Sequence, residues 1–192
     1  GIKVLPPDVN ISNGGFTADN GKIRFGLNAV KNVGRNLIER VVEERKEKPY
    51  SSLYDFCKRM HGTELSRRAV ECLIKAGAFD SMGVNRHSLV EAVDGIIKSV
   101  ESDSRRNLEG QLDLFSVMSG ESQTADTDSY EIKPFPEYSH TELLQQEKEV
   151  SGLYLSGQPL DAYREQSARF ASNSIKELTG EDAHKLDGNH VR

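Results

Sequence analysis

Five consecutive residues, Val30-Lys31-Asn32-Val33-Gly34, have the types and spacing of an anion site, and a stretch of helical periodicity follows them. A tight turn that opens a helix directs several unpaired backbone N–H groups at one point, and the helix dipole adds about half a positive charge there. Gly34 lets an anion approach the backbone, while Lys31 and Arg35 add flanking positive charge. The pattern predicts a phosphate site that is independent of nucleotide sequence.

The order of residue types here is that of a helix-hairpin-helix: an apolar residue, two variable residues, an apolar residue and glycine, then a helix. The usual hairpin has glycine where this chain has Asn32. Asparagine adopts the left-handed backbone conformation more readily than most residues, so the hairpin can still form. For this motif alone, an ordinary turn between two helices is the alternative.

A second, more degenerate hairpin is predicted at Ile74-Lys75-Ala76-Gly77-Ala78-Phe79, with Asn85 and Arg86 opening the next helix. Two hairpins in tandem can hold phosphates on both strands of a duplex. The alternative is that Gly77 only caps the helix before it, as glycine in that place most often does. The DNA-binding residues predicted from both hairpins are Lys31, Asn32, Val33, Gly34, Arg35, Lys75, Gly77, Ala78, Asn85 and Arg86.

A pentapeptide, Gln111-Leu112-Asp113-Leu114-Phe115, stands at the head of a polar stretch in which Ser, Thr, Asp, Glu and Gly dominate residues 116–131. Such a stretch buries too little apolar area to offset an ordering entropy of about 1–2 kcal/mol per residue. Apolar anchors in a flexible segment typically fill the pocket of a partner. The alternative is one more packed helical turn, because Leu108, Leu112 and Phe115 also lie at helical spacing.

The elements that must position these motifs follow from hydrophobic periodicity. Two short β-prone runs about Asn20-Gly21 predict a tight type I′ hairpin. Between residues 34 and 100, apolar residues recur on three helical stripes, with a short helical piece after Pro49, and helical structure resumes near Thr141. The predicted fold class is mainly α, with a small tandem helix-hairpin-helix domain preceded by a short β-hairpin and followed by a flexible linker and a further helix.

Composition excludes several classes of protein. The chain has 192 residues, is 36% hydrophobic and has a mean hydropathy of -0.58, which allows one ordinary domain or two small modules. It contains neither the roughly 20 apolar residues of a membrane span nor a signal peptide, so we expect a cytoplasmic protein. Cys57 and Cys72 lack the spacing of a zinc module or a disulfide scaffold and are expected to be buried thiols.

The charges are divided unevenly, with 16 Lys and Arg against 12 Asp and Glu in residues 1–100, and 9 against 18 in residues 101–192. The first half could meet a polyanion, but from charge alone solvated faces are the favoured explanation. Asp126 and Asp128 lack the further ligands of a calcium loop, and the histidines are scattered. We therefore expect no active site, metal or cofactor here. A start at Gly1 rather than Met suggests a piece of a longer protein.

Five blocks of sequence together resemble one family, the alpha subunit of bacterial DNA polymerase III. In order along the chain, the blocks are 4–10, 23–34, 73–80, 111–115 and 152–160. Asn32 departs from the family pattern, as does Gln158, which stands where histidine is common. The resemblance divides the chain into the end of the fingers region (1–27), a tandem helix-hairpin-helix on duplex DNA (28–100), a flexible linker with the sliding-clamp peptide (101–139), a helix and turn (140–165) and the lead into an oligonucleotide-binding fold (166–192).

The resemblance also implies a function. The family's nucleotidyl transfer uses palm carboxylates and Mg²⁺, and no palm motif lies in these residues, so the chain is expected to be non-catalytic. It would bind double-stranded DNA through phosphates and the sliding clamp through Gln111 to Phe115, and would thereby support processive replication. Other replisome subunits would be contacted through the parent chain, and no membrane partner is expected. There are two alternatives. One is a helix-hairpin-helix glycosylase or nuclease, which is disfavoured because Arg35 and Asn36 stand where a catalytic Lys or Asp belongs. The other is a clamp-associated adaptor.

Overall fold

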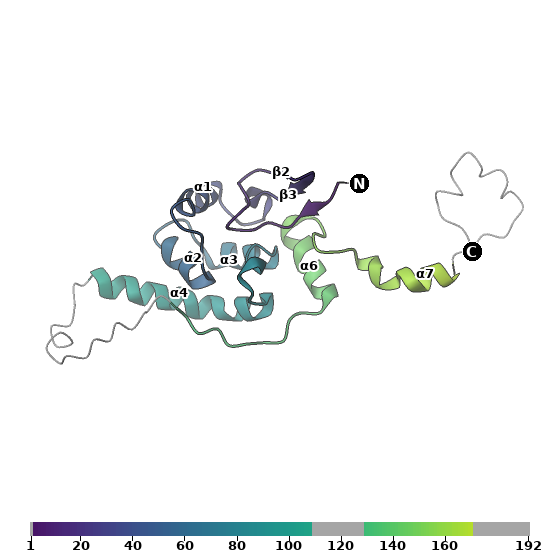
Figure 1. The fold of residues 1–192 in the computed structure, drawn as a ribbon. Helices are drawn as coiled ribbons and strands as arrows, with labels where there is room; N and C mark the ends of the chain where they lie inside the picture. The colour runs from purple at the N-terminus through teal and green to yellow at the C-terminus, as the bar shows by residue number, and fades with distance from the viewer. Residues whose placement is uncertain (1, 109–128, 171–192) are drawn as a thin grey trace, which may run out of the picture. The chain divides into compact units, whose positions relative to one another are not determined.

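The computed structural model describes residues 2–108 and 129–170, which belong to two separate compact units (Figure 1). The first unit extends to Ser156 and holds both predicted hairpins. In the second unit, a 3-10 helix, η3 (Pro159–Tyr163), is followed by α7 (Arg164–Phe170). The predicted lead into an oligonucleotide-binding fold lies mostly outside the described residues. The pentapeptide 111–115 lies entirely outside them.

A three-stranded sheet begins the chain. Its strands β1 (Val4–Leu5), β2 (Thr17–Asp19) and β3 (Lys22–Arg24) have the order β1-β3-β2, with β2 antiparallel and β1 parallel to β3. Asn20 and Gly21 have φ values of 49° and 76°, and a type I′ turn requires positive φ at both central residues, so the predicted hairpin is confirmed. Strand β1 was not expected, because a strand of two residues is too short to show a hydrophobic alternation in the sequence.

The helices follow the predicted stripes. In chain order they are η1 (Leu27–Ala29), α1 (Arg35–Glu44), α2 (Leu53–Arg59), α3 (Arg67–Lys75), η2 (Asp80–Met82), α4 (Arg86–Leu108) and α6 (His140–Ser151). Ser52, Ser66 and Ser139 each accept a hydrogen bond from a backbone N–H in the first turn of α2, α3 and α6, which is the usual way such a helix start is satisfied. The mainly α fold class, with its helix-hairpin-helix domain, is confirmed.

One apolar core joins the sheet segment to the helices. Phe56 lies edge-on between Tyr50 and Phe79, with ring centroids 5.0 and 5.1 Å away. Val9 is fully buried and donates its N–H to the Ala78 carbonyl at 2.9 Å. Residues on both sides of the boundary expected at residue 27 therefore contribute to one core.

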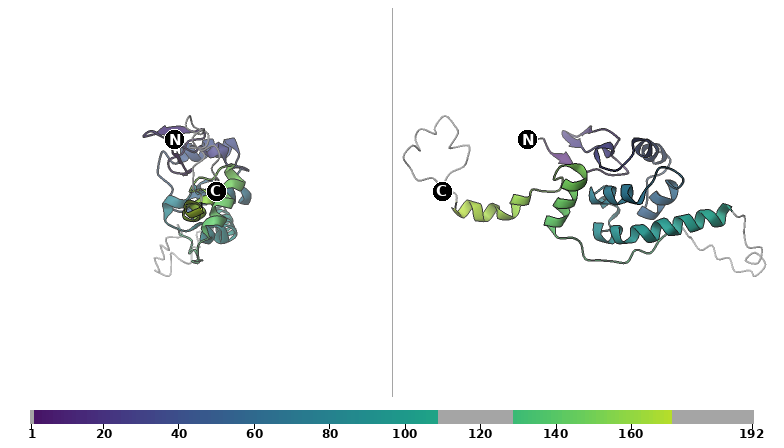
Figure 2. Two further views of the ribbon diagram at one scale, coloured as in Figure 1. Left: turned by 90° about the vertical axis from the view of Figure 1, so that its right-hand side faces the viewer. Right: turned by 180° about the vertical axis from the view of Figure 1, so that it is seen from behind.

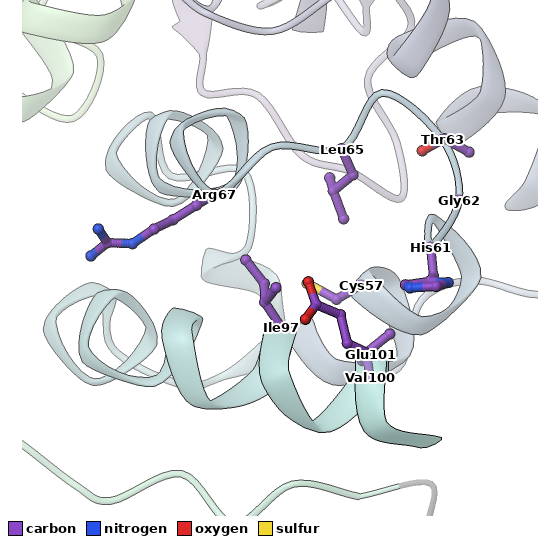
Figure 3. Close-up of a pocket in the computed structure, with 9 residues that line it drawn as sticks. All are labelled: Cys57, His61, Gly62, Thr63, Leu65, Arg67, Ile97, Val100 and Glu101. Atoms are coloured by element: carbon purple, nitrogen blue, oxygen red, sulfur yellow. The ribbon is translucent and has the colours of Figure 1, made fainter. Parts of the chain in front are cut away.

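Both cysteines are buried free thiols, as predicted. Burial raises the pKa of the Cys57 thiol to about 12. This side chain lies at a pocket between the α2–α3 loop and α4, beside Leu65 and Ile97 (Figure 3). Among the described residues, no group of three His, Cys, Asp or Glu side chains is placed to hold a metal ion.

The structure describes two parts of the segment predicted to be a flexible linker, residues 101–108 and 129–139. Helix α4 continues to Leu108, and residues 130–139, here called the strap, return along it. Several strap contacts are hydrogen bonds: Ser88 Oγ accepts from the Phe135 N–H at 2.8 Å, and the Asn85 side-chain amide donates to the Phe135 carbonyl at 2.7 Å. Tyr130 packs over Gly95, where a Cβ would lie 1.9 Å from the Tyr130 hydroxyl. The sequence predicted a linker here because contacts made by hydrogen bonds do not produce a periodic pattern of hydrophobic residues.

The views in Figure 2 show α4 running beneath α2 and α3 in the same unit. Helix α6 packs beside α3 at the end of this group where α4 begins. None of the helices in the described part of the chain has the length and apolar character needed to cross a bilayer.

Candidate nucleic-acid interface

The first hairpin has the geometry of an open anion site. Asn32 has φ of 60°, so asparagine takes the left-handed conformation that glycine usually supplies. Gly34 is the N-cap of the ten-residue helix α1 and offers no side-chain acceptor, and the first turn of α1 contains no acidic residue. The N–H groups of this turn therefore have no cap from the helix itself. Arg35 is exposed at the same end.

A carboxylate from the α2–α3 loop lies at this helix start. Glu64 Oε1 accepts from the Asn36 side-chain amide at 3.3 Å, and a Cβ on Gly34 would lie 3.4 Å from Glu64 Oε2. Negative charge at a helix N-terminus is stabilising, and it also offsets part of the positive potential that an incoming phosphate would meet. Because Glu64 is exposed, its side chain can turn away from the helix.

Lys31 is held by α6 rather than projecting freely. Its backbone N–H donates to the Val150 carbonyl at 2.8 Å, and its ammonium donates to the Glu149 carbonyl at 2.7 Å. These carbonyls belong to the last turn of α6, where a helix leaves its acceptors unsatisfied. The predicted phosphate ligand Lys31 therefore also connects the first hairpin to α6.

The second hairpin is a helix cap. The Gly77 N–H donates to the Ile74 carbonyl at 2.8 Å, and the Ala78 N–H donates to the Leu73 carbonyl at 2.9 Å. With φ of 85° at Gly77, this pair of bonds forms a Schellman motif at the end of α3. The structure thus follows the alternative in which Gly77 closes the preceding helix.

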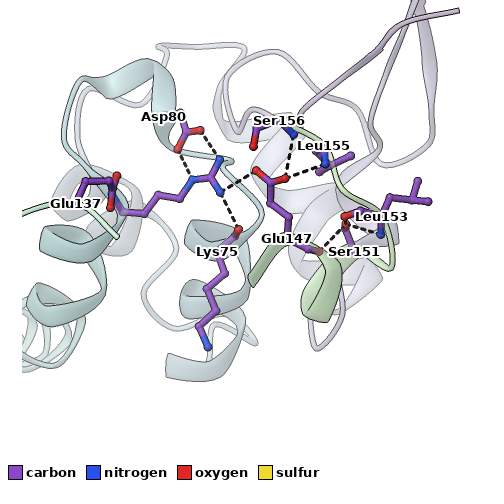
Figure 4. A network of polar contacts seen from close by, with 9 residues as sticks. Lys75, Asp80, Glu137, Glu147, Ser151, Leu153, Leu155 and Ser156 are labelled. Carbon is purple, nitrogen blue, oxygen red and sulfur yellow. Dashed lines mark hydrogen bonds and ion pairs between the residues drawn. The ribbon is translucent and has the colours of Figure 1, made fainter. Parts of the chain in front are cut away.

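An ion-pair network with two buried members, Arg86 and Glu147, and the exposed Asp80 covers this cap (Figure 4). Arg86 is 5% exposed, and its Nε and Nη2 donate to the two oxygens of Asp80 at 2.9 and 2.7 Å. Its Nη1 donates to Glu147 at 3.0 Å and to the Lys75 carbonyl at 3.2 Å. Burial lowers the pKa of Arg86, but the hydrogen bonds and charges of Asp80 and Glu147 raise it overall. Arg86 therefore stays charged inside the protein.

The start of α4 is also occupied. Asn85 Oδ1 accepts from the Ser88 N–H at 2.8 Å, and Glu137 of the strap accepts from the N–H groups of Arg86 and His87 at 2.9 and 3.1 Å. The same carboxylate accepts from the Tyr138 N–H at 2.9 Å. These bonds satisfy the donors that would otherwise face a phosphate.

The two predicted hairpins thus differ in what they can bind. Lys31 to Arg35 lie at an exposed helix start. Gly77, Ala78 and Arg86 lie inside the protein, Asn85 caps α4, and Lys75 is half-buried, so the second hairpin presents no open anion site in this structure. Glu137 and Glu147, which lie more than 50 residues along the chain, close this site in the structure, and contact of Gly77, Ala78 and Arg86 with DNA stays a prediction.

Glu137 gives the fold a specific dependence on pH. Burial would raise the pKa of Glu137, but backbone hydrogen bonds from Arg86, Tyr138 and His87 and the charge of Arg86 lower it overall. A depressed folded-state pKa contributes stability above the unfolded pKa of roughly 4.3 and loses it as the pH falls through the folded value.

We expect Glu137→Gln to lower the free energy of unfolding at pH 7 by about 1 kcal/mol, a modest figure because the group is exposed. The difference from wild type should shrink as the pH is lowered below about 4. Urea unfolding at several pH values measures it, with Glu131→Gln, on the same strap, as the control. A difference that does not change with pH would show that the charge of Glu137 is not what stabilises α4.

Comparison with known proteins agrees with the hairpin geometry. The helix-hairpin-helix motif family model matches residues 1–89. The chain is 39% identical over 176 residues to the DNA polymerase III subunit alpha of Borreliella burgdorferi, which covers 91% of the chain and 15% of that protein. It is 37% identical over 181 residues to that of Bacillus subtilis and 34% identical over 172 residues to that of Escherichia coli K12, again covering 15% of each.

The chain thus spans about 15% of the length of these curated relatives, and the match covers 91% of its own residues in the Borreliella and Bacillus comparisons. With the helix-hairpin-helix match, these identities place the chain in the family of DNA polymerase III alpha subunits, as one segment of such a protein.

Proposed function

We propose that this chain is a non-catalytic segment of a cytoplasmic replicative polymerase that holds duplex DNA through backbone phosphates. The uncapped start of α1 behind the left-handed Asn32 is the observation that carries the proposal. Backbone N–H groups and Arg35 recognise a phosphate without reading bases, which suits an enzyme that must move along any sequence. The curated relatives are polymerase subunits, so the glycosylase or nuclease alternative has no support among them.

Catalytic Mg²⁺ is assigned to the rest of the parent protein in this proposal. The described residues offer no cluster of three acidic, His or Cys side chains that fits a metal ion. In this proposal the segment contributes by holding DNA.

DNA affinity should depend on Arg35. We expect Arg35→Ala to weaken binding to a labelled 20-base-pair duplex about three- to tenfold and to reduce the slope of log K against log salt by about 1, because one phosphate contact is lost. Fluorescence anisotropy at several salt concentrations measures both quantities. Arg40→Ala is the matched control, since Arg40 lies on the same helix and pairs with Glu44 at 2.7 Å. Equal losses in both variants would mean that only net charge matters.

We propose further that Gln111 to Phe115 bind the bacterial sliding clamp. Two apolar anchors at Leu114 and Phe115 in an acidic, polar stretch support this, as does the likeness to the polymerase family. A clamp that encircles DNA and a segment that grips DNA would act together, since a tether raises the effective concentration of the second contact. Other replisome subunits would be reached through the rest of the parent protein.

Clamp binding has a direct test. We expect the Leu114→Ala/Phe115→Ala double variant to bind a purified bacterial clamp at least about 30-fold more weakly than wild type, because buried apolar anchors dominate such interfaces. Isothermal titration calorimetry is suitable, with Val117→Ala/Met118→Ala as the control for apolar side chains just outside the pentapeptide. Failure of the wild-type chain to bind would contradict the clamp proposal and leave the DNA proposal intact.

A further inference from the structure

Helix α6 belongs to the core although it lies beyond the residues that the helix-hairpin-helix family model matches, which end at 89. Leu144 and Val150 are 1% and 2% exposed, and Glu147 between them is completely buried. A fully buried carboxylate is retained only where it is paired and hydrogen-bonded. The partners of Glu147 therefore indicate what α6 does.

The carboxyl end of α6 contacts the first hairpin. The backbone N–H and the ammonium of Lys31 donate to the carbonyls of Val150 and Glu149, at 2.8 and 2.7 Å. A cation at a helix C-terminus interacts favourably with the helix dipole. Lys31 directly precedes Asn32, so α6 fixes the backbone at the entry of the left-handed turn.

The middle of α6 contacts the second hairpin. Glu147 Oε1 accepts from Arg86 at 3.0 Å, and Arg86 in turn holds Asp80 and the last carbonyl of α3. The other oxygen of Glu147 accepts from the N–H groups of Leu155 and Ser156 at 2.8 and 2.9 Å, which secures the chain that leaves α6. Figure 4 shows Leu155 and Ser156 beside the Glu147 carboxylate.

We propose that α6 is a brace that fixes the first hairpin relative to the α3–α4 turn, and that Glu147 is a positioning residue for DNA binding although it cannot touch DNA. This inference rests on the proposed DNA-binding function. Phosphate binding by backbone N–H groups depends on the direction of those groups, so a loosened hairpin has lower affinity even when the fold persists. The DNA-binding unit accordingly includes α6 and extends to Ser156.

The test compares two substitutions of the same chemistry on one helix. Glu147→Gln removes the buried charge of the network, whereas Glu149→Gln removes an exposed charge two residues away. If charge alone mattered, each variant would bind DNA slightly more tightly, because each is less acidic. The brace predicts the opposite sign for Glu147→Gln, a loss of about five- to tenfold, with Glu149→Gln at or slightly above wild type.

Hydrogen exchange of the Lys31 amide supplies a measurement that needs no DNA. The Lys31 N–H is bonded to Val150, so Glu147→Gln should accelerate its exchange at least about fivefold relative to Glu149→Gln, at a temperature where circular dichroism shows both variants folded. If Glu147→Gln does not fold, Val150→Ala replaces it, with a smaller change expected in both measurements.

The brace proposal would be overturned if Glu147→Gln left the exchange rate of the Lys31 amide unchanged, or if the two Gln variants had equal affinity for DNA. If the wild-type chain shows no DNA affinity at all, the proposed function fails. The exchange rates then still decide whether α6 holds the hairpin.

Discussion

Arg86→Met is expected to lower the free energy of unfolding by about 3–5 kcal/mol, because it leaves a buried charge without its partner. Glu147 is 0% exposed and loses its only cationic partner within the described residues, while Asp80 is released from a bidentate pair. Methionine fills much of the space of the aliphatic part of arginine, so the loss reports the charge network more than a cavity.

Urea unfolding at pH 7 measures this loss, and Arg67→Met provides the matched comparison. Arg67 also bridges two carboxylates, Glu71 at 3.0 Å and Asp94 at 2.7 Å, but its side chain is 59% exposed. An exposed pair contributes about 0–1 kcal/mol. Similar losses in both variants would show that burial of the Arg86 network does not govern its contribution.

A double variant tests whether the loss in Arg86→Met comes from the unpaired charge of Glu147. In Arg86→Met/Glu147→Leu no buried charge remains at this position, so much of the stability should return. This recovery also bears on the brace, since the apolar pair would keep α6 docked without an ion pair. Failure of the double variant to recover would assign the loss to the Asp80 contact, the Lys75 carbonyl and the Leu155 and Ser156 N–H groups that lose Glu147 as acceptor.

Local patterns were sufficient for the first hairpin and for the helices. Asn20-Gly21 and Asn32 take the left-handed conformation because each sits in a turn whose requirement is local, and residue type alone indicates it. The apolar stripes of α1, α3 and the first half of α4 likewise follow from a period that any packed helix must show.

The second hairpin could not be predicted in this way because its chemistry is non-local. Whether Gly77 faces a phosphate or caps α3 depends on Arg86, and the state of Arg86 depends on Glu147, which is 61 residues further along the chain. A signal was present, however. Glu147 lies at helical spacing with Leu143, Leu144 and Val150, and a charged residue on an apolar stripe indicates a buried partner.

The position of the strap along α4 could not be predicted, for a different reason. It attaches through hydrogen bonds of backbone groups and of Glu137 and through a few aromatic contacts, such as Tyr130 over Gly95, which leave no alternation or period in the sequence. It was included in the predicted linker because residues 101–139 lack helical periodicity and the stretch before it is polar. Composition reports how much hydrophobic area a segment can bury and not which hydrogen bonds it can complete.

Gly77→Ala is the second substitution with a large expected effect, about 3 kcal/mol or more of lost stability. Two causes combine at this position. A non-glycine residue at φ of 85° costs about 1–2 kcal/mol, and the new Cβ would lie 2.4 Å from Arg86 Nη2, which forces the guanidinium from Asp80. Gly83→Ala is the control, because Gly83 has φ of 77° but no atom within 4 Å of its added Cβ. Its loss should be about 1–2 kcal/mol.

The two large effects are not independent, and their coupling is itself a test of the network. If the Cβ acts by displacing Arg86, then Gly77→Ala in an Arg86→Met background should lose only what Gly83→Ala loses, because the flexible methionine can move aside. The double-mutant cycle should then give a coupling of about 1–2 kcal/mol from urea unfolding. Additive losses would mean that Gly77 is required for its backbone conformation alone, and that the arginine merely lies near it.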